Sequence, residues 1–223
     1  FYEYAASTEE RRNLAVVRKG EYEALKAKLV NPQWQPDFGP AEFVKAKHTG
    51  ATAISARDFL IAYNVNLNTT STRRANAVAY DIREKGRIKR VGEVLSGDIV
   101  KDADGNTLWT PGKLKHVKAI GWYIEEYGVT QVTMNITNIT ETPLHLAFDE
   151  TAKAANARGI RATGSELVGL VPKSAMLDAG KYFLRKQNRS TGIHESELIK
   201  IAIKSMGLDE LGPFIPEERI IEY

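Results

Sequence analysis

The chain has 223 residues, of which 43% are hydrophobic and 26% charged, enough for one large domain or two small ones. A formal net charge of +3 is too small to indicate a nucleic-acid-binding protein, and no apolar run approaches the roughly 18 residues of a membrane-spanning helix. The absence of cysteine excludes disulfides, thiolate zinc sites and cysteine nucleophiles. With no secretory segment at its start, the sequence predicts a cytoplasmic protein that binds neither nucleic acid nor a membrane.

The beginning of the sequence is unusual. Residues 1–6 lack an initiator Met and are typical of the end of a strand, which leads into a helix capped by Ser7 or Thr8. The helix is predicted from about Glu9, with a break at Gly20. We therefore expect the sequence to be a fragment of a longer protein.

Helical periodicity then stops, and residues 31–50 are rich in Pro and Gly. Structureless loops of about twenty residues are uncommon inside compact domains and are usually functional. Two interpretations stand at this point, an interdomain linker and a functional loop. Within the loop, Lys45, Lys47 and His48 could face an anion or could simply keep the loop soluble.

The remaining elements follow clearer patterns. We predict strands at 59–67, 117–125, 129–137 and from 160, helices at 72–85, 143–158, 173–186 and 195–206, and a surface hairpin within 87–114. Between residues 58 and 166 the order is strand, helix, strand, strand, helix, strand. This predicts an α/β (α+β sandwich) fold, a ferredoxin-like βαββαβ unit with both helices on one face of an antiparallel sheet, followed by C-terminal helices.

Strand alternation predicts which side chains lie on the face that the two helices leave uncovered. They are amides and hydroxyls rather than the usual charges: Asn64, Asn66, Gln131, Thr133, Asn135 and Thr137. Such groups would hold a polar heterocycle or an amide. Because Asn and Gln are poor strand formers, their presence here favours a functional role over a structural one. An interdomain interface or a wetted surface remains the alternative.

An RNA-recognition module shares this topology but stacks bases on strand aromatics. Here Phe59 and Tyr63 are predicted to point toward the helices, which argues against such a module. His116, His145 and His194 have no second ligand at metal-binding spacing, so we interpret them as surface or capping residues and expect no metal.

Several long strings are similar to the glutamate formiminotransferase family. They are Arg11-Arg-Asn-Leu, Arg18-Lys-Gly-Glu-Tyr-Glu-Ala-Leu25, Pro36-Asp-Phe-Gly-Pro40, Ala56-Arg-Asp-Phe-Leu-Ile-Ala-Tyr-Asn-Val-Asn-Leu67, Gly121-Trp-Tyr-Ile-Glu-Glu126, Gln131-Val-Thr-Met-Asn135, Thr163-Gly-Ser-Glu-Leu-Val-Gly-Leu-Val-Pro172 and Glu218-Arg-Ile-Ile-Glu-Tyr223. The resemblance covers essentially the whole chain in the right order.

The resemblance implies two α/β subdomains with folate bound between them. Residues 1–56 would be the C-terminal part of the first subdomain, with the folate loop, and residues 57–223 the whole second subdomain. The family's folate-binding segment falls on Gly39, Pro40, Ala41, Glu42, Phe43, Val44, Lys45, Ala46, Lys47, His48, Thr49 and Gly50. Its interior departs from the family's pattern, so Gly39, Pro40 and Gly50 carry over best. Residues 87–114 resemble a surface insertion.

By this resemblance, the enzyme moves the formimino group of N-formimino-L-glutamate to N5 of tetrahydrofolate, which can be polyglutamylated, during histidine degradation. A homo-oligomer is expected. Asn64, Asn66, Gln131 and Asn135 become candidates for facing the substrate. The reaction needs general acid-base help. The family's catalytic histidine belongs to a His-Pro-Arg-Met-Gly type motif upstream of Phe1, so no residue of this sequence is assigned that role and we expect the fragment alone to be inactive.

Two further functions stay open from the sequence. One keeps the folate and changes the donor, as in formyl transfer between 5-formyltetrahydrofolate and glutamate. The other is a catalytically silent folate-binding module.

Overall fold

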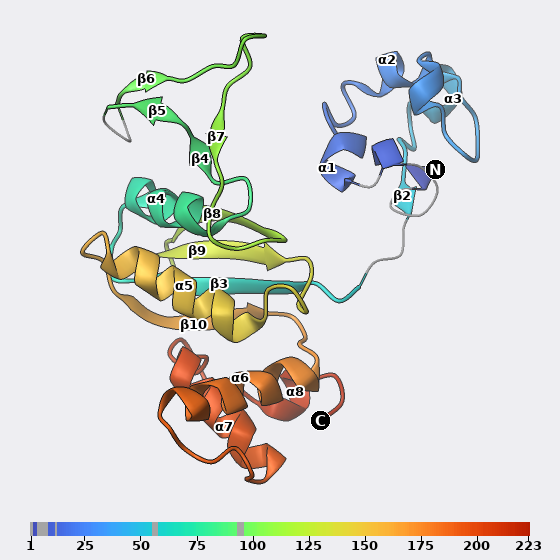
Figure 1. Cartoon of the computed structure of the whole chain (residues 1–223). Helices are drawn as coiled ribbons and strands as arrows, with labels where there is room; N and C mark the ends of the chain where they lie inside the picture. Colours follow the sequence, from blue (N-terminus) through green and yellow to red (C-terminus); the bar gives the residue numbers. More distant parts are fainter. Residues whose placement is uncertain (1, 4–8, 12, 55–57, 93–95) are drawn as a thin grey trace. The chain divides into compact units, whose positions relative to one another are not determined.

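The computed structural model describes residues 2–3, 9–11, 13–54, 58–92 and 96–223. The chain divides into two compact units, Phe1–Asp58 and Phe59–Tyr223, and each has a hydrophobic core of its own (Figure 1). Three predicted features lie outside the described residues: the helix caps Ser7 and Thr8, and the domain boundary between residues 56 and 57.

The first unit is built from short elements. They are β1 (Tyr2–Glu3), η1 (Glu9–Arg11), α1 (Leu14–Val17), α2 (Leu25–Leu29), η2 (Pro32–Trp34), α3 (Phe43–Ala46) and β2 (Ala53–Ile54). Strands β1 and β2 pair in parallel. The predicted break at Gly20 is confirmed, because Gly20 and Glu21 have φ values of +79° and +48°, which end a right-handed helix. The single helix predicted from about Glu9 up to this break is wrong, because the extended backbone of Asn13 separates η1 from α1.

The second unit is built on a four-stranded antiparallel sheet with the order β10-β3-β9-β8. Its strands are β3 (Ile61–Leu67), β8 (Val117–Ile124), β9 (Val129–Ile136) and β10 (Ala162–Val168). The helices α4 (Thr72–Ile82) and α5 (Leu144–Asn156) both pack on one face of this sheet (Figure 1). The predicted ferredoxin-like βαββαβ fold is therefore confirmed.

The core lies between this sheet face and the two helices. Every second residue of β3, from Ile61 through Tyr63 to Leu67, is fully buried there. Alternation thus predicts the core correctly. Phe59 is the exception: it precedes β3 and is 58% exposed, so the prediction that its ring points toward the helices is wrong.

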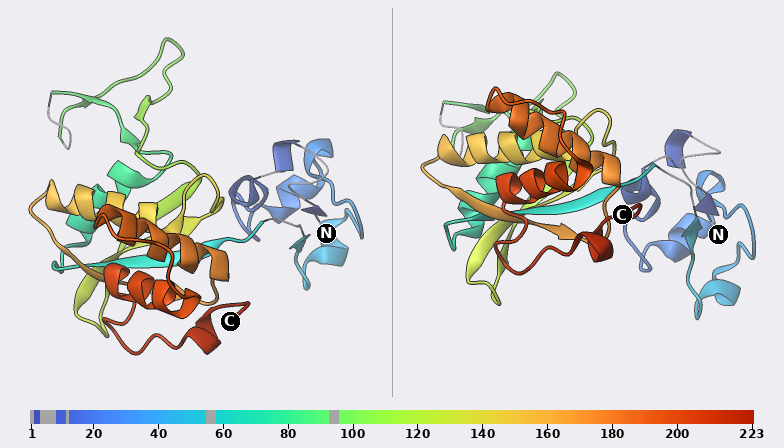
Figure 2. Two further views of the ribbon diagram at one scale, coloured as in Figure 1. Left: turned by 60° about the horizontal axis from the view of Figure 1, so that its bottom comes forward. Right: turned by 90° about the horizontal axis from the view of Figure 1, so that it is seen from below.

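Three helices complete the second unit: α6 (Lys173–Lys186), α7 (Glu195–Met206) and α8 (Pro216–Arg219). Helices α6 and α7 pack side by side and against α5 (Figure 2). The bounds of α6 and α7 are as predicted, whereas the short α8 was not predicted. Gly207 ends α7 in the left-handed conformation, and its carbonyl accepts a hydrogen bond of 2.9 Å from Ser165 N–H. The chain after α7 is thereby fixed to the edge of β10.

The predicted surface hairpin is present as a narrow arm between α4 and β8. It contains β4 (Arg87–Ile88) paired with β7 (Trp109–Thr110), and β5 (Arg90–Val91) paired with β6 (Asp98–Ile99).

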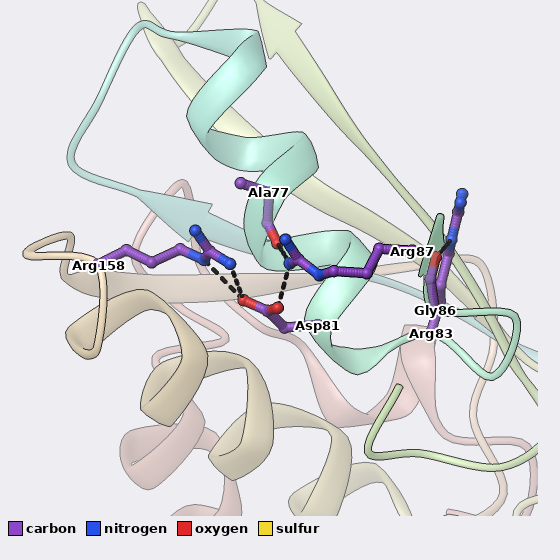
Figure 3. A network of polar contacts seen from close by, with 6 residues as sticks. All are labelled: Ala77, Asp81, Arg83, Gly86, Arg87 and Arg158. Carbon is purple, nitrogen blue, oxygen red and sulfur yellow. Dashed lines mark hydrogen bonds and ion pairs between the residues drawn. The ribbon is translucent and has the colours of Figure 1, made fainter. Parts of the chain in front are cut away.

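The base of the arm is anchored to the helices by ion pairs. Asp81 of α4 is contacted from opposite sides by the guanidinium groups of Arg87 and Arg158 (Figure 3). Arg158 Nε donates to Asp81 at 2.6 Å, and Arg87 also donates to the Ala77 carbonyl at 3.0 Å. We call Asp81, Arg87 and Arg158 the helix-face cluster.

None of the helices within the described part of the chain is both long and apolar enough to cross a membrane.

Candidate functional site

The sheet face opposite α4 and α5, here called the open face, carries the predicted amides. Strand pairing places Asn66 directly opposite Gln131, and Asn64 directly opposite both Thr133 and Glu166. Residues paired across antiparallel strands lie on the same face. Adjacent strands therefore bring Asn64, Asn66, Gln131 and Glu166 together.

These side chains form one continuous hydrogen-bonded network with Glu210. Gln131 donates to Asn66 Oδ1 at 2.8 Å and to Glu166 Oε2 at 3.3 Å. Asn64 donates to the same Glu166 oxygen at 3.2 Å, and Asn66 donates to Glu210 Oε2 at 2.5 Å. We call these five residues the amide–carboxylate cluster.

The cluster is more deeply buried than a face without helices would suggest. Asn66 and Gln131 are 0% exposed and Asn64 is 8% exposed, so the alternative of a wetted surface does not hold for these three side chains. Two of their oxygens, Asn64 Oδ1 and Gln131 Oε1, are buried without a hydrogen-bond donor among the described residues. A buried acceptor left without a donor costs about 1–3 kcal/mol, so these two atoms call for an explanation.

Asn135 lies on the same face but outside the cluster. It is exposed and pairs with Ala62 and Lys118 on the neighbouring strands. Thr137 is also separate, because its hydroxyl donates to the His116 carbonyl at 2.9 Å. The structure thus brings together three of the four predicted substrate-facing amides.

The two carboxylates of the cluster were not singled out from the sequence. Glu166 follows from alternation in β10, since Gly164, Glu166 and Val168 share the open face. Glu210 comes from the segment after α7, and no local pattern places that segment there. Gly164 makes the approach possible, because a Cβ atom at this position would lie 2.4 Å from Glu210 Oε2 and 2.7 Å from the Gly207 carbonyl.

An aromatic side chain borders the cluster. Trp122 of β8 is paired directly with Gln131 and is 55% exposed. An exposed indole next to buried amides offers a flat apolar surface beside polar groups, a combination common in small-molecule sites. Sequence reasoning considered aromatics on other strands and missed this one.

The predicted folate segment of the first unit forms a loop around α3. Gly39 and Gly50 at its ends have φ values of +90° and +68°, which suit glycine. Before the segment, the Arg11 guanidinium pairs with Asp37 at 2.7 Å and donates to the carbonyls of Gln33 and Gln35. This buried arginine fixes the chain that leads into Gly39.

Two cavities in the first unit involve this segment. The smaller, of about 140 Å³, is lined by Gly39, Pro40, Thr49 and Gly50 with neighbouring apolar residues. The larger, of about 500 Å³, includes residues 49–53, Tyr22 and Lys28. Ligand sites for small molecules usually exceed about 300 Å³, so the larger cavity is the better candidate.

Lys28 is a candidate that the sequence analysis missed. Its ammonium donates to the Val17 carbonyl at 2.6 Å and lies 5.2 Å from the centre of the Trp34 ring. Burial lowers the pKa of Lys28, and the nearby Glu21 carboxylate opposes this effect. The cation at the cavity wall could pair with a carboxylate of a ligand.

The other predicted residues of the segment are mostly exposed, and the Lys45 ammonium pairs with Glu42 at 3.0 Å. His48 is exposed as well, beside Lys47, whose carbonyl accepts a 2.5 Å hydrogen bond from the Tyr22 hydroxyl. Both interpretations of Lys45, Lys47 and His48, an anion site and a solubilising loop, therefore stay predictions.

The three other histidines differ from one another. His194 caps α7 through a bond from Ser196 N–H, which confirms a capping role. His145 is not an ordinary surface residue, because its ring stacks on Tyr182 with centroids 4.3 Å apart and its Nδ1 is buried. Among the described residues, no group of His, Asp or Glu is arranged to hold a metal ion.

Comparison with known proteins places both units in one family. Residues 62–223 match the formiminotransferase domain, and residues 1–57 match its N-terminal subdomain. The chain is 45% identical over 222 residues to the formimidoyltransferase-cyclodeaminase of Gallus gallus, a match that covers 100% of the chain and 37% of that relative.

Shorter relatives match as well. The glutamate formimidoyltransferase of Thermoplasma acidophilum is 35% identical over 204 residues, 90% of the chain and 58% of the relative. That of Streptococcus pyogenes serotype M1 is 33% identical over 187 residues, 84% of the chain and 54% of the relative. The chain thus spans 37% to 58% of the length of these curated relatives. The formiminotransferase domain matches most of the length of this chain, residues 62–223. The chain therefore belongs to the formiminotransferase domain family.

Proposed function

We propose that this chain is part of a glutamate formimidoyltransferase that moves the formimino group of N-formimino-L-glutamate to N5 of tetrahydrofolate, in histidine degradation. The observation that carries the proposal is the amide–carboxylate cluster of a chain of the formiminotransferase family, in which two buried oxygens have no donor within the part of the chain that the structure describes. Such groups are positioned to receive N–H donors, and both proposed substrates carry them.

The first unit would supply the folate-binding segment, residues 39–50. The cavity of about 500 Å³ next to residues 49–53 and the Lys28 ammonium support a role in holding a ligand with carboxylates. In this proposal residues 1–56 belong to the N-terminal subdomain and residues 57–223 form the second subdomain. A polyglutamyl form of tetrahydrofolate would carry the same acidic tail.

The chemistry needs a base to remove the N5 proton and an acid to protonate the departing glutamate nitrogen. The cluster contains carboxylates and amides, and none of its described members is a histidine. We therefore assign the cluster to binding and orientation, and we place the proton transfers on the upstream histidine of the family. We also propose that the protein is cytoplasmic and forms a homo-oligomer.

The test is turnover by the full-length protein with tetrahydrofolate as acceptor. We expect formation of 5-formiminotetrahydrofolate from N-formimino-L-glutamate, and a much lower rate with N-formyl-L-glutamate. A higher rate with the formyl donor would replace the proposal with formyl transfer. If both donors fail while folate still binds in calorimetry, the chain belongs to a silent folate-binding module.

A further inference from the structure

In the amide–carboxylate cluster the amide NH₂ groups all donate, whereas some of the acceptor oxygens receive no hydrogen bond from the described residues. Both the Asn64 and Gln131 amide groups donate to one oxygen of Glu166, and Asn66 donates to Glu210. Among the described residues, the buried acceptors of the cluster that remain without a donor are Asn64 Oδ1 and Gln131 Oε1.

The cluster is also negatively charged. It contains Glu166 and Glu210, and no Lys or Arg among the described residues forms a recorded ion pair with either one. Glu210 is exposed to solvent, whereas Glu166 is half-buried beside the two buried amide oxygens. The unpaired charge of Glu166 and these oxygens are costly unless a cation or a set of donors satisfies them. The complementary ligand is therefore a compact cation that carries several N–H groups.

We propose that the amide–carboxylate cluster binds the formamidinium head of the donor, with Glu166 as the residue that selects it. This inference rests on the proposed function, and it assigns one of the two substrates to the open face. An amidinium is planar, positively charged and donates through both nitrogens, so it pairs with a carboxylate in the two-point manner of a guanidinium. Of its three N–H groups two pair with Glu166, and the third would be shared between Asn64 Oδ1 and Gln131 Oε1 as a bifurcated hydrogen bond.

The charge of the ligand separates this assignment from the alternatives. A tetrahydropterin ring is neutral, so its N–H groups can donate to Glu166 but cannot compensate its charge. A formyl group offers an acceptor oxygen where the amidinium has a donor, and that oxygen would face Glu166. A site with acceptors and negative charge rejects such a neutral isostere, because its own groups stay unpaired.

Access to the buried oxygens requires a movement of Glu166. Its side chain is half-buried at the open face, and both Asn64 and Gln131 are bonded to it. A cation that pairs with the carboxylate draws it away from the two amides. The amide oxygens then become available to the same ligand.

The experiment is steady-state kinetics of the full-length protein with Glu166→Gln, which keeps the shape and removes the charge. We expect KM for N-formimino-L-glutamate to rise about tenfold or more with KM for tetrahydrofolate unchanged. Discrimination against N-formyl-L-glutamate should fall. Glu166→Asp, which keeps the charge, should lie between the wild type and Glu166→Gln.

The matched control is Glu126→Gln in the exposed turn after β8, with wild-type kinetics expected. Thermal unfolding of each variant shows whether it folds. A second probe is acetamidinium chloride, which should inhibit competitively against N-formimino-L-glutamate and not against tetrahydrofolate, with choline chloride as the salt control.

The outcomes separate the two levels of the proposal. If the wild type does not use N-formimino-L-glutamate, the proposed function fails. If the wild type does so, but Glu166→Gln raises KM for tetrahydrofolate instead, the cluster holds the pterin and the inference is overturned. Unchanged kinetics in a folded Glu166→Gln protein would overturn it as well.

Discussion

The second unit contains two polar clusters that differ in how completely their charges and hydrogen-bonding groups are paired. In the helix-face cluster, one carboxylate, Asp81, is shared by two guanidinium groups, so its charge is fully compensated. In the amide–carboxylate cluster, three amides donate to one another and to the Glu166 and Glu210 carboxylates, and two amide oxygens receive no donor from the described residues. A closed network stabilises the fold. An open network, in which some acceptors have no donor, lowers stability, and such a network is typical of a binding site.

The largest effect on stability is expected for Asp81→Ala. It leaves Arg87 and Arg158 without a carboxylate, and the side chain of Arg87 is only 14% exposed. We expect the free energy of unfolding to fall by about 2–3 kcal/mol, less than for a fully buried pair because Asp81 is partly exposed. Transferase activity at low temperature should not change. Chemical denaturation measures this effect, and a loss of activity without loss of stability would reverse the comparison.

Gly164→Ala tests whether the close approach of Glu210 matters. The added Cβ would lie 2.4 Å from the Glu210 carboxylate and 2.7 Å from the Gly207 carbonyl, so the segment after α7 must shift. We expect a loss of stability of about 1–3 kcal/mol by overpacking, together with weaker binding of the donor. Gly212→Ala is the matched control, since Gly212, like Gly164, does not have a positive φ, and a Cβ there meets open space. Equal binding defects in the two variants would exclude a role for Glu210.

Gln131→Met should separate function from stability. It removes the donors to Asn66 and Glu166, which destabilises, and also the buried Oε1 that has no donor among the described residues, which stabilises. Because the two effects partly offset and the length of the side chain is kept, the stability should fall by only about 1 kcal/mol. We expect the catalytic efficiency with N-formimino-L-glutamate to fall about tenfold or more. Gln187→Met, on the exposed end of α6, is the matched control. If Gln131→Met is severely unstable and active when folded, the open network is structural.

The smallest effect concerns pH and lies away from both clusters. Burial lowers the pKa of His145, opposed by the Asp178 and Asp149 carboxylates and assisted by Arg185. The unfolded chain, with a histidine pKa of about 6.5, therefore binds this proton more readily than the folded protein. Stability from this group is complete above about pH 6.5 and declines as the pH falls below it. The difference in unfolding free energy between wild type and His145→Phe should shrink on acidification, and a constant difference would contradict this account.

Much of the second unit could be predicted from its sequence because its signals are local. Alternation in β3 and β9 placed Asn64, Asn66 and Gln131 on one face, and periodicity gave α6 and α7. The first unit was predicted less well. There, the extended backbone of Asn13 divides the segment that was predicted as one helix, and the positive φ at Glu21 has no sequence signal.

Only the amides of the candidate site could be predicted from the sequence, and the reason is physical. Its amides belong to regular strands, whereas Glu210 reaches Asn66 through the path of the segment after α7. That path depends on Gly164 and on the bond from Ser165 to Gly207, which are tertiary contacts. The strand pattern places Asn66 and Gln131 on this face but does not indicate that both are 0% exposed.

The most direct test of the central claim is nuclear magnetic resonance of the side-chain amides in the full-length protein during titration with N-formimino-L-glutamate. The account predicts that the NH₂ resonances of Asn64 and Gln131 shift, because their oxygens gain donors, while those of Asn135 and the exposed Gln187 stay in place. Saturable shifts confined to Asn135, or none in Asn64 and Gln131 at saturating donor, would contradict it.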